Sequence, residues 1–182
     1  MQSSDKPMPA TAAERFHLDR FATPIGVALL VTDADGRLCA LDWEDYAHRM
    51  AELMRQQYGR ADLVEGAAPP PVTRALKDYF AGDLAALDAV ACRFGGTPFQ
   101  RAVWSALRGI APGTTTSYGA LAARIDRPKA VRAVGHANGA NPISVVVPCH
   151  RVIGATGAPT GYGGGLPRKR WLLAHEGVTV DG

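Results

Sequence analysis

Apolar and polar positions alternate along residues 16–43, which is the period expected of β-strands. Two strand-like segments, 27–32 and 37–42, lie on either side of an Asp35-Gly36 pair. Asp-Gly is a dipeptide typical of two-residue hairpin turns. The pattern therefore predicts an antiparallel hairpin near the start of the chain.

Helical spacing of apolar side chains replaces this alternation over residues 44–58. After a proline-rich break at 66–71, a shorter helix is predicted over 72–80, and residues 89–94 predict a further strand. The first half of the chain is thus expected to form a small α/β unit, and none of its residues suggests chemistry.

The second half begins after Gly95-Gly96 with a helix whose start is well marked. Thr97 can cap it, Pro98 suits its first position, and Gln100 completes a capping box. Two shorter helices are predicted further on. The first covers 118–124 behind a Ser117 cap, and the second covers 129–138, with Pro128 starting it.

Two short helices joined by a tight turn predict a helix-turn-helix. The second of them carries small residues, which are Ala130, Ala133, Gly135 and Ala137. Small side chains let a helix backbone approach another surface closely. That surface can be the minor groove of DNA or a neighbouring helix in a core, and the spacing alone does not choose between them.

Apart from Ser144, residues 143–147 are apolar and β-branched, so they predict a buried strand that Pro148 ends. Cys149 follows at once. A lone cysteine is commonly an inert buried thiol. Here His150 and Arg151 stand beside it and can favour the thiolate, and Glu176 offers a carboxylate to orient an imidazole. These are the parts of an activated thiol.

The chain has 182 residues, of which 47% are apolar, enough for a substantial core. Its net charge of +3 is unevenly spread. Residues 1–96 hold 10 Lys/Arg and 14 Asp/Glu, whereas residues 97–182 hold 10 and 3. The basic second half is typical of a protein that binds a polyanion, although a solvated basic face explains the charge equally well.

Three cysteines without paired spacing argue against a disulfide framework, and no local zinc signature is present. We expect no metal, no cofactor and a reducing compartment, the cytoplasm. The chain lacks an apolar run of about eighteen residues, so no membrane span is expected. Residues 1–14 are polar and predict a loose tail.

Val147-Pro-Cys-His-Arg-Val-Ile153 resembles the active-site signature of the O6-alkylguanine-DNA alkyltransferases. The resemblance extends over residues 98–178, nearly half the chain. Further matching motifs are Ser117-Tyr118, Pro128–Gly135, Asn141-Pro142, Tyr162–Leu166 and Trp171–Gly177. Several motifs in the same order make chance similarity an inadequate explanation.

The sequence pattern and the resemblance together suggest a fold and a division of the chain. We expect a flexible tail over 1–15, and an α/β N-terminal domain with a ribonuclease-H-like sheet over 16–94. A mainly α C-terminal domain over 95–182 would carry a winged helix-turn-helix and the active site. We expect a monomer without an obligate protein partner.

The resemblance also implies a reaction, the single-use repair of O6-alkylguanine, and of O4-alkylthymine in some members. Cys149 would accept the alkyl group irreversibly from a base flipped out of double-stranded DNA. His150 would take the thiol proton through a water molecule, and Glu176 would hold His150. Asn141 would brace the turn around the site. Tyr118 would rotate the phosphate and donate a hydrogen bond to N3 of the leaving base.

Arg132 would fill the stack that the damaged nucleotide leaves. Other residues implied at the DNA surface are Ser117, Arg127, Ala130, Ala133 and Gly135. Those implied at the base pocket are Val152, Tyr162, Gly163, Gly164 and Lys169. Backbone groups at Cys149 and Val152 would accept from the exocyclic amine. DNA affinity should fall with salt, with little sequence preference.

Two positions depart from the pattern of some members. Gly163 stands where some carry Ser beside the tyrosine, which removes a hydroxyl contact to O6. Arg127 replaces an Asn before the helix-starting proline and can contact a phosphate instead. No counterpart of the dispersed Cys/His zinc site of some relatives is evident, since Cys39 and Cys92 lie in strand-like segments.

Three other functions are consistent with parts of this sequence. A lesion sensor would flip the base without reacting, but relatives of that kind lack the cysteine. A Cys-His-Glu hydrolase would use the triad and leave Arg132 without a role. A transcription regulator would use Arg132 to read an operator. The Pro-Cys-His-Arg motif and Arg132 together favour the alkyltransferase.

Overall fold

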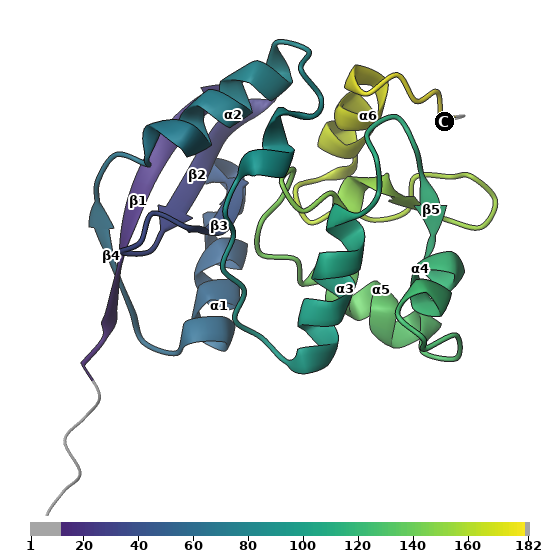
Figure 1. The fold of residues 1–182 in the computed structure, drawn as a ribbon, viewed down its shortest axis with the longest axis horizontal. Coiled ribbons are helices and arrows are strands. Elements are labelled where there is room, and N and C mark those ends of the chain that lie inside the picture. The colour runs from purple at the N-terminus through teal and green to yellow at the C-terminus, as the bar shows by residue number, and fades with distance from the viewer. Residues whose placement is uncertain (1–11, 181–182) are drawn as a thin grey trace, which may run out of the picture.

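The computed structural model describes residues 12–180, in which a mixed sheet lies beside a group of helices (Figure 1). The sheet strands are β1 (Glu14–Thr23), β2 (Gly26–Thr32), β3 (Leu38–Trp43) and β4 (Ala61–Glu65). Their order is β3-β2-β1-β4. The first three pair antiparallel, whereas β4 pairs parallel to β1 after a helical crossover.

The predicted hairpin, the helix after it and the second helix are confirmed. Helix α1 (Ala47–Tyr58) follows a short 3-10 turn, η1 (Glu44–Tyr46), and α2 (Pro70–Phe80) follows the prolines. Strand β1 begins at Glu14, inside the stretch expected to be a tail. The rest of that prediction, over residues 1–11, lies outside the described residues.

Both faces of the sheet are covered. In β2, Leu29 and Val31 join the cluster that buries Met50 and Met54 of α1, whereas Ala28 and Leu30 point into the other cluster. This second cluster contains α2 and side chains of every later helix, so the two halves of the chain share one continuous core. Figure 1 shows α2 lying across the sheet and the later helices gathered beside it.

The second half consists of short elements. Its longer helices are α3 (Pro98–Arg108), α4 (Tyr118–Arg124), α5 (Val131–Gly139) and α6 (Leu166–His175). Its remaining elements are β5 (Thr116–Ser117), η3 (Cys149–Arg151) and β6 (Val152–Ile153), and a further 3-10 turn, η2 (Ala86–Ala89), precedes α3. Among residues 12–180, no helix is both long and apolar enough to cross a membrane.

Three local predictions were wrong in extent or type. Residues 89–94 make only one bridge, between Cys92 and Leu38, and form no longer strand. Helix α5 begins at Val131 instead of 129, because the amide of Ala130 bonds to the carbonyl of Arg127 at 2.8 Å and closes a turn that contains Pro128.

Residues 143–147 are buried as predicted but form no strand. Val145 has a φ of 70°, a left-handed conformation that β-branched residues rarely adopt and that breaks an extended run. The segment is instead joined to β3 by two backbone hydrogen bonds. The amide of Leu41 donates to Pro142 O at 3.0 Å, and the amide of Ser144 donates to Leu41 O at 2.9 Å.

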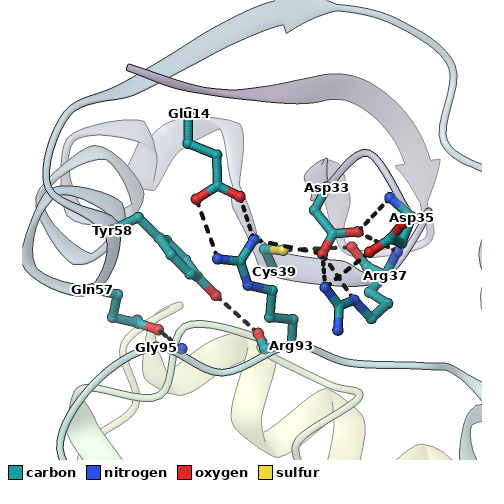
Figure 2. Close-up of polar contacts among 9 residues, drawn as sticks. All are labelled: Glu14, Asp33, Asp35, Arg37, Cys39, Gln57, Tyr58, Arg93 and Gly95. Carbon is teal, nitrogen blue, oxygen red and sulfur yellow. Dashed lines mark hydrogen bonds and ion pairs between the residues drawn. The ribbon is translucent and has the colours of Figure 1, made fainter. Parts of the chain in front are cut away.

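A polar cluster ties the chain between the two halves to the sheet (Figure 2). The Arg93 guanidinium pairs with Glu14 of β1 and lies 3.6 Å from the Asp33 carboxylate. The Arg93 carbonyl accepts from the Tyr58 hydroxyl at 3.0 Å, and the Gly95 amide donates to the Gln57 side chain at 3.2 Å. The segment leading to α3 is therefore fixed before that helix begins.

Helix α3 has the predicted capping box. The Gln100 amide donates to the Thr97 hydroxyl oxygen at 3.1 Å, and the Thr97 amide donates to the Gln100 side chain at 2.9 Å.

Thr97→Ala should lower the free energy of unfolding by about 1 kcal/mol, because a helix amide loses its acceptor. Urea unfolding measures this. Thr156→Ala, in an exposed turn, is the control and should change stability less; equal losses would contradict the role of the cap.

Candidate active site

Cys149 opens η3, directly after the buried irregular segment. Asn141 holds this segment from within. Its side-chain amide donates to Val147 O at 2.8 Å, and its side-chain oxygen accepts from the Ile143 amide at 3.0 Å. Asn141 is fully buried. The turn that presents Cys149 is thus held by one amide side chain and, through Leu41, by a strand of the first half.

Glu176 lies just past the end of α6, and its carboxylate is the centre of a buried network. Oε1 accepts from His150 Nε2 at 2.9 Å and from Arg151 Nη2 at 2.8 Å, and Oε2 accepts from Arg151 Nε at 2.9 Å. The Tyr79 hydroxyl of α2 also donates to Oε1, at 2.7 Å. The expected neighbourhood of Glu176 and His150 is therefore present.

The ionised carboxylate determines which His150 nitrogen carries the proton. Burial alone would raise the pKa of Glu176, but the hydrogen bonds from His150 and Arg151 lower it well below its usual range. Burial lowers the pKa of His150 despite the opposing effect of Glu176, so the imidazole is neutral at rest. A neutral ring that donates from Nε2 leaves the Nδ1 lone pair free to accept a proton. Nδ1 is buried and has no partner among the described residues.

The Cys149 thiol is protonated at rest. Burial raises its pKa, although Asn141, Arg49 and Lys169 act in the opposite direction. Arg151 does not compensate, because its guanidinium is turned away to Glu176 and to the Ile110 carbonyl. The expectation that Arg151 favours the thiolate directly is thus wrong. A reaction of this thiol as a nucleophile would therefore need a base to take its proton.

A pocket of about 170 Å³ opens onto Cys149 between α5 and the loop that precedes α6. Its lining residues are Tyr118, Gly135, Asn138, Gly139, Cys149, Gly161, Tyr162 and Gly163. Five of these are residues that the sequence indicated. Val152, Gly164 and Lys169, also indicated, do not line it.

Each of these three residues is buried. Val152 is buried in β6, and a Cβ at Gly164 would collide with the indole of Trp43. Lys169 is fully buried and donates to the carbonyls of Val152 at 2.6 Å, Thr160 at 3.0 Å and Gly161 at 3.2 Å. Burial lowers the pKa of Lys169 to about 8. Lys169 therefore links β6, at Val152, to residues 160–161 of the loop that precedes α6.

The glycine at 163, unexpected from the resemblance, has a steric reason. A Cβ there would lie 2.5 Å from the guanidinium carbon of Arg49. Arg49 pairs with buried Asp42 at 2.6 Å and donates to the carbonyls of Gly139 at 2.7 Å and Asn141 at 3.2 Å. Arg49 thus occupies the space that a serine side chain would need.

The indicated DNA-contact residues lie on and around α4 and α5. Arg127, Arg132 and Ala133 are exposed, whereas Ala130 and Gly135 are half-buried. Ser117 caps α4 by accepting from the Ala120 amide at 3.1 Å. Four exposed cations occur in this region, namely Arg124, Arg127, Lys129 and Arg132. Tyr118 joins this surface to the pocket, since its ring lies against Gly135 and its hydroxyl is 3.4 Å from Thr160 O.

Sequence reasoning missed Tyr79, the Asp42–Arg49 pair and the pocket residue Asn138. Tyr79 was indistinguishable from other apolar positions of its helix. Asp42 gave a signal, because a carboxylate at the end of an apolar strand needs a partner when buried. Within the described residues, no three His, Cys, Asp or Glu side chains gather where a metal ion could bind.

Comparisons with known proteins give one consistent result. Residues 98–178 match the model of the 6-O-methylguanine DNA methyltransferase DNA-binding domain. The methylated-DNA–protein-cysteine methyltransferase of Salmonella typhimurium is 52% identical over 164 residues, 89% of this chain and 96% of that protein. The enzyme of the same name from Haemophilus influenzae is 39% identical, over 87% of this chain and 84% of that protein.

Solved structures agree. Mycobacterium tuberculosis OGT in complex with DNA is similar with a TM-score of 0.72 and 39% identity, covering 89% of this chain and 92% of that one. The similarity spans both halves and is not limited to the residues around Cys149. The chain therefore belongs to the methylated-DNA–protein-cysteine methyltransferase family.

Proposed function

We propose that this protein repairs O6-alkylguanine in double-stranded DNA by transferring the alkyl group irreversibly to Cys149. The observation that carries the proposal is the placement of Cys149. Its thiol faces a small pocket, and the next residue is a neutral histidine oriented by an ionised carboxylate. A thiol, a base and an orienting acid are the groups that nucleophilic attack on a soft alkyl carbon requires.

In the transfer step, one bond forms between sulfur and the alkyl carbon, and one bond between that carbon and O6 breaks. The Cys149 sulfur attacks the alkyl carbon as the thiol proton passes, through a water, to His150 Nδ1. The bond from carbon to O6 breaks, and its electrons stay on guanine. A hydrogen bond from the Tyr118 hydroxyl to N3 stabilises this developing charge. The product is a thioether, which has no ready leaving path, so each molecule reacts once.

The base must leave the helix to reach this pocket, at a cost of a few kcal/mol. We propose that α5 lies in the minor groove, with its exposed small residue Ala133 allowing close approach and Arg132 stacking where the base was. The surrounding cations would contact phosphates, so affinity should fall with salt. Contacts of this kind read sequence poorly.

The finer architecture is also a proposal. The β3-β2-β1-β4 order, with β4 parallel to β1, supports a ribonuclease-H-like sheet for residues 16–94. Helices α4 and α5 with the small β5–β6 pair support a winged helix-turn-helix within 95–182. We propose that the first unit supports the second, chiefly through the contacts of Tyr79, Arg49 and Leu41.

Cys149→Ala should abolish transfer, because neither other thiol lies in the pocket. Intact-protein and peptide mass spectrometry after mixing with excess duplex carrying one O6-methylguanine should find one methyl group, on Cys149. Cys39→Ala and Cys92→Ala, the controls, should each still gain one. An unmodified wild-type protein that nevertheless binds the lesion would exclude transfer and favour a lesion sensor.

Arg132→Ala should slow transfer from duplex DNA about 10–100-fold, because the flipped state loses the side chain that replaces the base. Single-turnover quench experiments at saturating DNA measure the rate constant. Arg60→Ala removes an equal charge from an exposed position in the first half and should leave the rate unchanged. If both variants slowed equally, net charge and not stacking would explain the effect.

Glu176→Gln should slow transfer by about 100-fold or more, because the amide can offer its own N–H to Nε2 and favour the imidazole tautomer with Nδ1 protonated. The single-turnover rate constant is the measurement, and affinity for undamaged duplex should not change. Glu52→Gln, on the exposed face of α1, is the matched control. A wild-type rate in Glu176→Gln would remove Glu176 from the proposed base-orienting role.

A further inference from the structure

Tyr79 connects the first half of the chain to Glu176 and to the neighbouring His175. It lies in the last turn of α2, with no exposed surface. Its hydroxyl donates to Glu176 Oε1 at 2.7 Å, and its backbone carbonyl accepts from His175 Nε2 at 2.8 Å. The two bonds hold consecutive residues at the end of α6, which Figure 1 shows beside α2 near the same end of the molecule.

The Tyr79 hydroxyl and His150 donate hydrogen bonds to the same oxygen atom of Glu176. Glu176 Oε1 accepts from Tyr79, from His150 Nε2 and from Arg151 Nη2, whereas Oε2 accepts only from Arg151 among the described residues. A hydrogen bond to an ionised carboxylate is strong in a buried site. Each donor on Oε1 also withdraws charge that would otherwise stabilise a protonated His150. Tyr79 therefore acts on position and on charge together.

Tyr79 is suited to remain a donor. Burial, together with the Glu176 carboxylate, raises the pKa of its phenol far above the usual range, so the hydroxyl keeps its proton. Its ring is held edge-on by Phe80 and by His175, with centroids 5.2 Å away in both cases. Trp171 stacks on His175 at 4.8 Å. The hydroxyl is aimed by packing and not by the carboxylate alone.

We propose that Tyr79 is a positioning residue for alkyl transfer, whose hydroxyl fixes Glu176 and moderates its charge so that His150 stays a neutral, oriented base. This inference rests on the proposed function of Cys149. It assigns a defined role in the reaction to the first half of the chain.

The proposal has a consequence for pH. Loss of the Tyr79 hydroxyl leaves more negative charge on Glu176 facing His150, which raises the pKa of His150 toward or above its usual value. Since only neutral His150 can accept the thiol proton, the fall in transfer rate at low pH moves to higher pH. The charged groups that act on His150 and Glu176 are Arg151 and Lys169, and those next to Tyr79 are Tyr162 and His175. Cys149 directly precedes His150 in the chain. None of these groups changes in the variant.

The experiment compares wild type, Tyr79→Phe and Tyr58→Phe in single-turnover transfer from O6-methylguanine duplex between about pH 5 and 8. Tyr58→Phe is the matched control. Tyr58 is also a tyrosine of the first half whose hydroxyl donates a hydrogen bond, but its acceptor is the Arg93 carbonyl instead of Glu176. Figure 2 shows this contact. Thermal unfolding and affinity for undamaged duplex are measured for all three proteins.

We expect Tyr79→Phe to move the acid limb upward by about half a pH unit or more and to slow transfer several-fold at its plateau. DNA affinity should be unchanged, and Tyr58→Phe should keep the wild-type profile. A lower plateau with an unmoved acid limb would overturn the proposal and leave Tyr79 as packing alone. An unchanged rate and profile would also overturn it. Wild type that transfers no methyl group would instead refute the proposed function, so the two failures are distinguishable.

Discussion

The site depends on one buried carboxylate. Glu176 is 4% exposed and joins three parts of the chain, namely the end of α2, the turn after Cys149 and the end of α6. Burying an ionised group is costly unless every lone pair is used, and here Arg151 and Tyr79 bind it besides His150. Arg151, two residues after Cys149 in sequence, thus neutralises the carboxylate that binds His150, and this explains why its guanidinium is turned away from the thiol.

The first half of the chain takes part in the geometry of the second. The backbone of Leu41 in β3 is hydrogen-bonded to the segment before Cys149. Arg49 of α1 donates to the carbonyls of Gly139 and Asn141 and lies against Gly163. Side chains of both halves pack in one apolar cluster, so neither half can shift without moving Leu41 and Arg49 relative to the residues that they contact. The α/β unit, in which the sequence suggests no chemistry, thus holds the backbone on both sides of the pocket at Cys149.

Much of this arrangement could be predicted from local pattern. The Asp35-Gly36 hairpin, the capping box at Thr97 and the Ser117 cap follow from residues close in sequence, and the resemblance located Cys149, His150 and Glu176. The failures came from tertiary contacts. Val145 adopts a left-handed conformation because the segment is bonded to β3, which overrides its β-propensity. The Tyr79 hydroxyl bonds to Glu176 and the Arg49 guanidinium to the Asn141 carbonyl, each more than ninety residues away, so no local periodicity could have indicated these two contacts.

The protonated, enclosed state of Cys149 bears on how long an unused molecule survives. Peroxides and small soluble electrophiles attack exposed thiolates first, and further oxidation destroys a cysteine permanently. Cys149 is 5% exposed, and burial raises its pKa and so keeps it in the thiol form. Cys39 is protected in the same way, since burial raises its pKa to about 11. The thiol that we propose reacts only once is therefore shielded from faster but unselective reactions with oxidants and small electrophiles. Discrimination between damaged DNA and the surrounding solution begins with access and protonation, before any base is recognised.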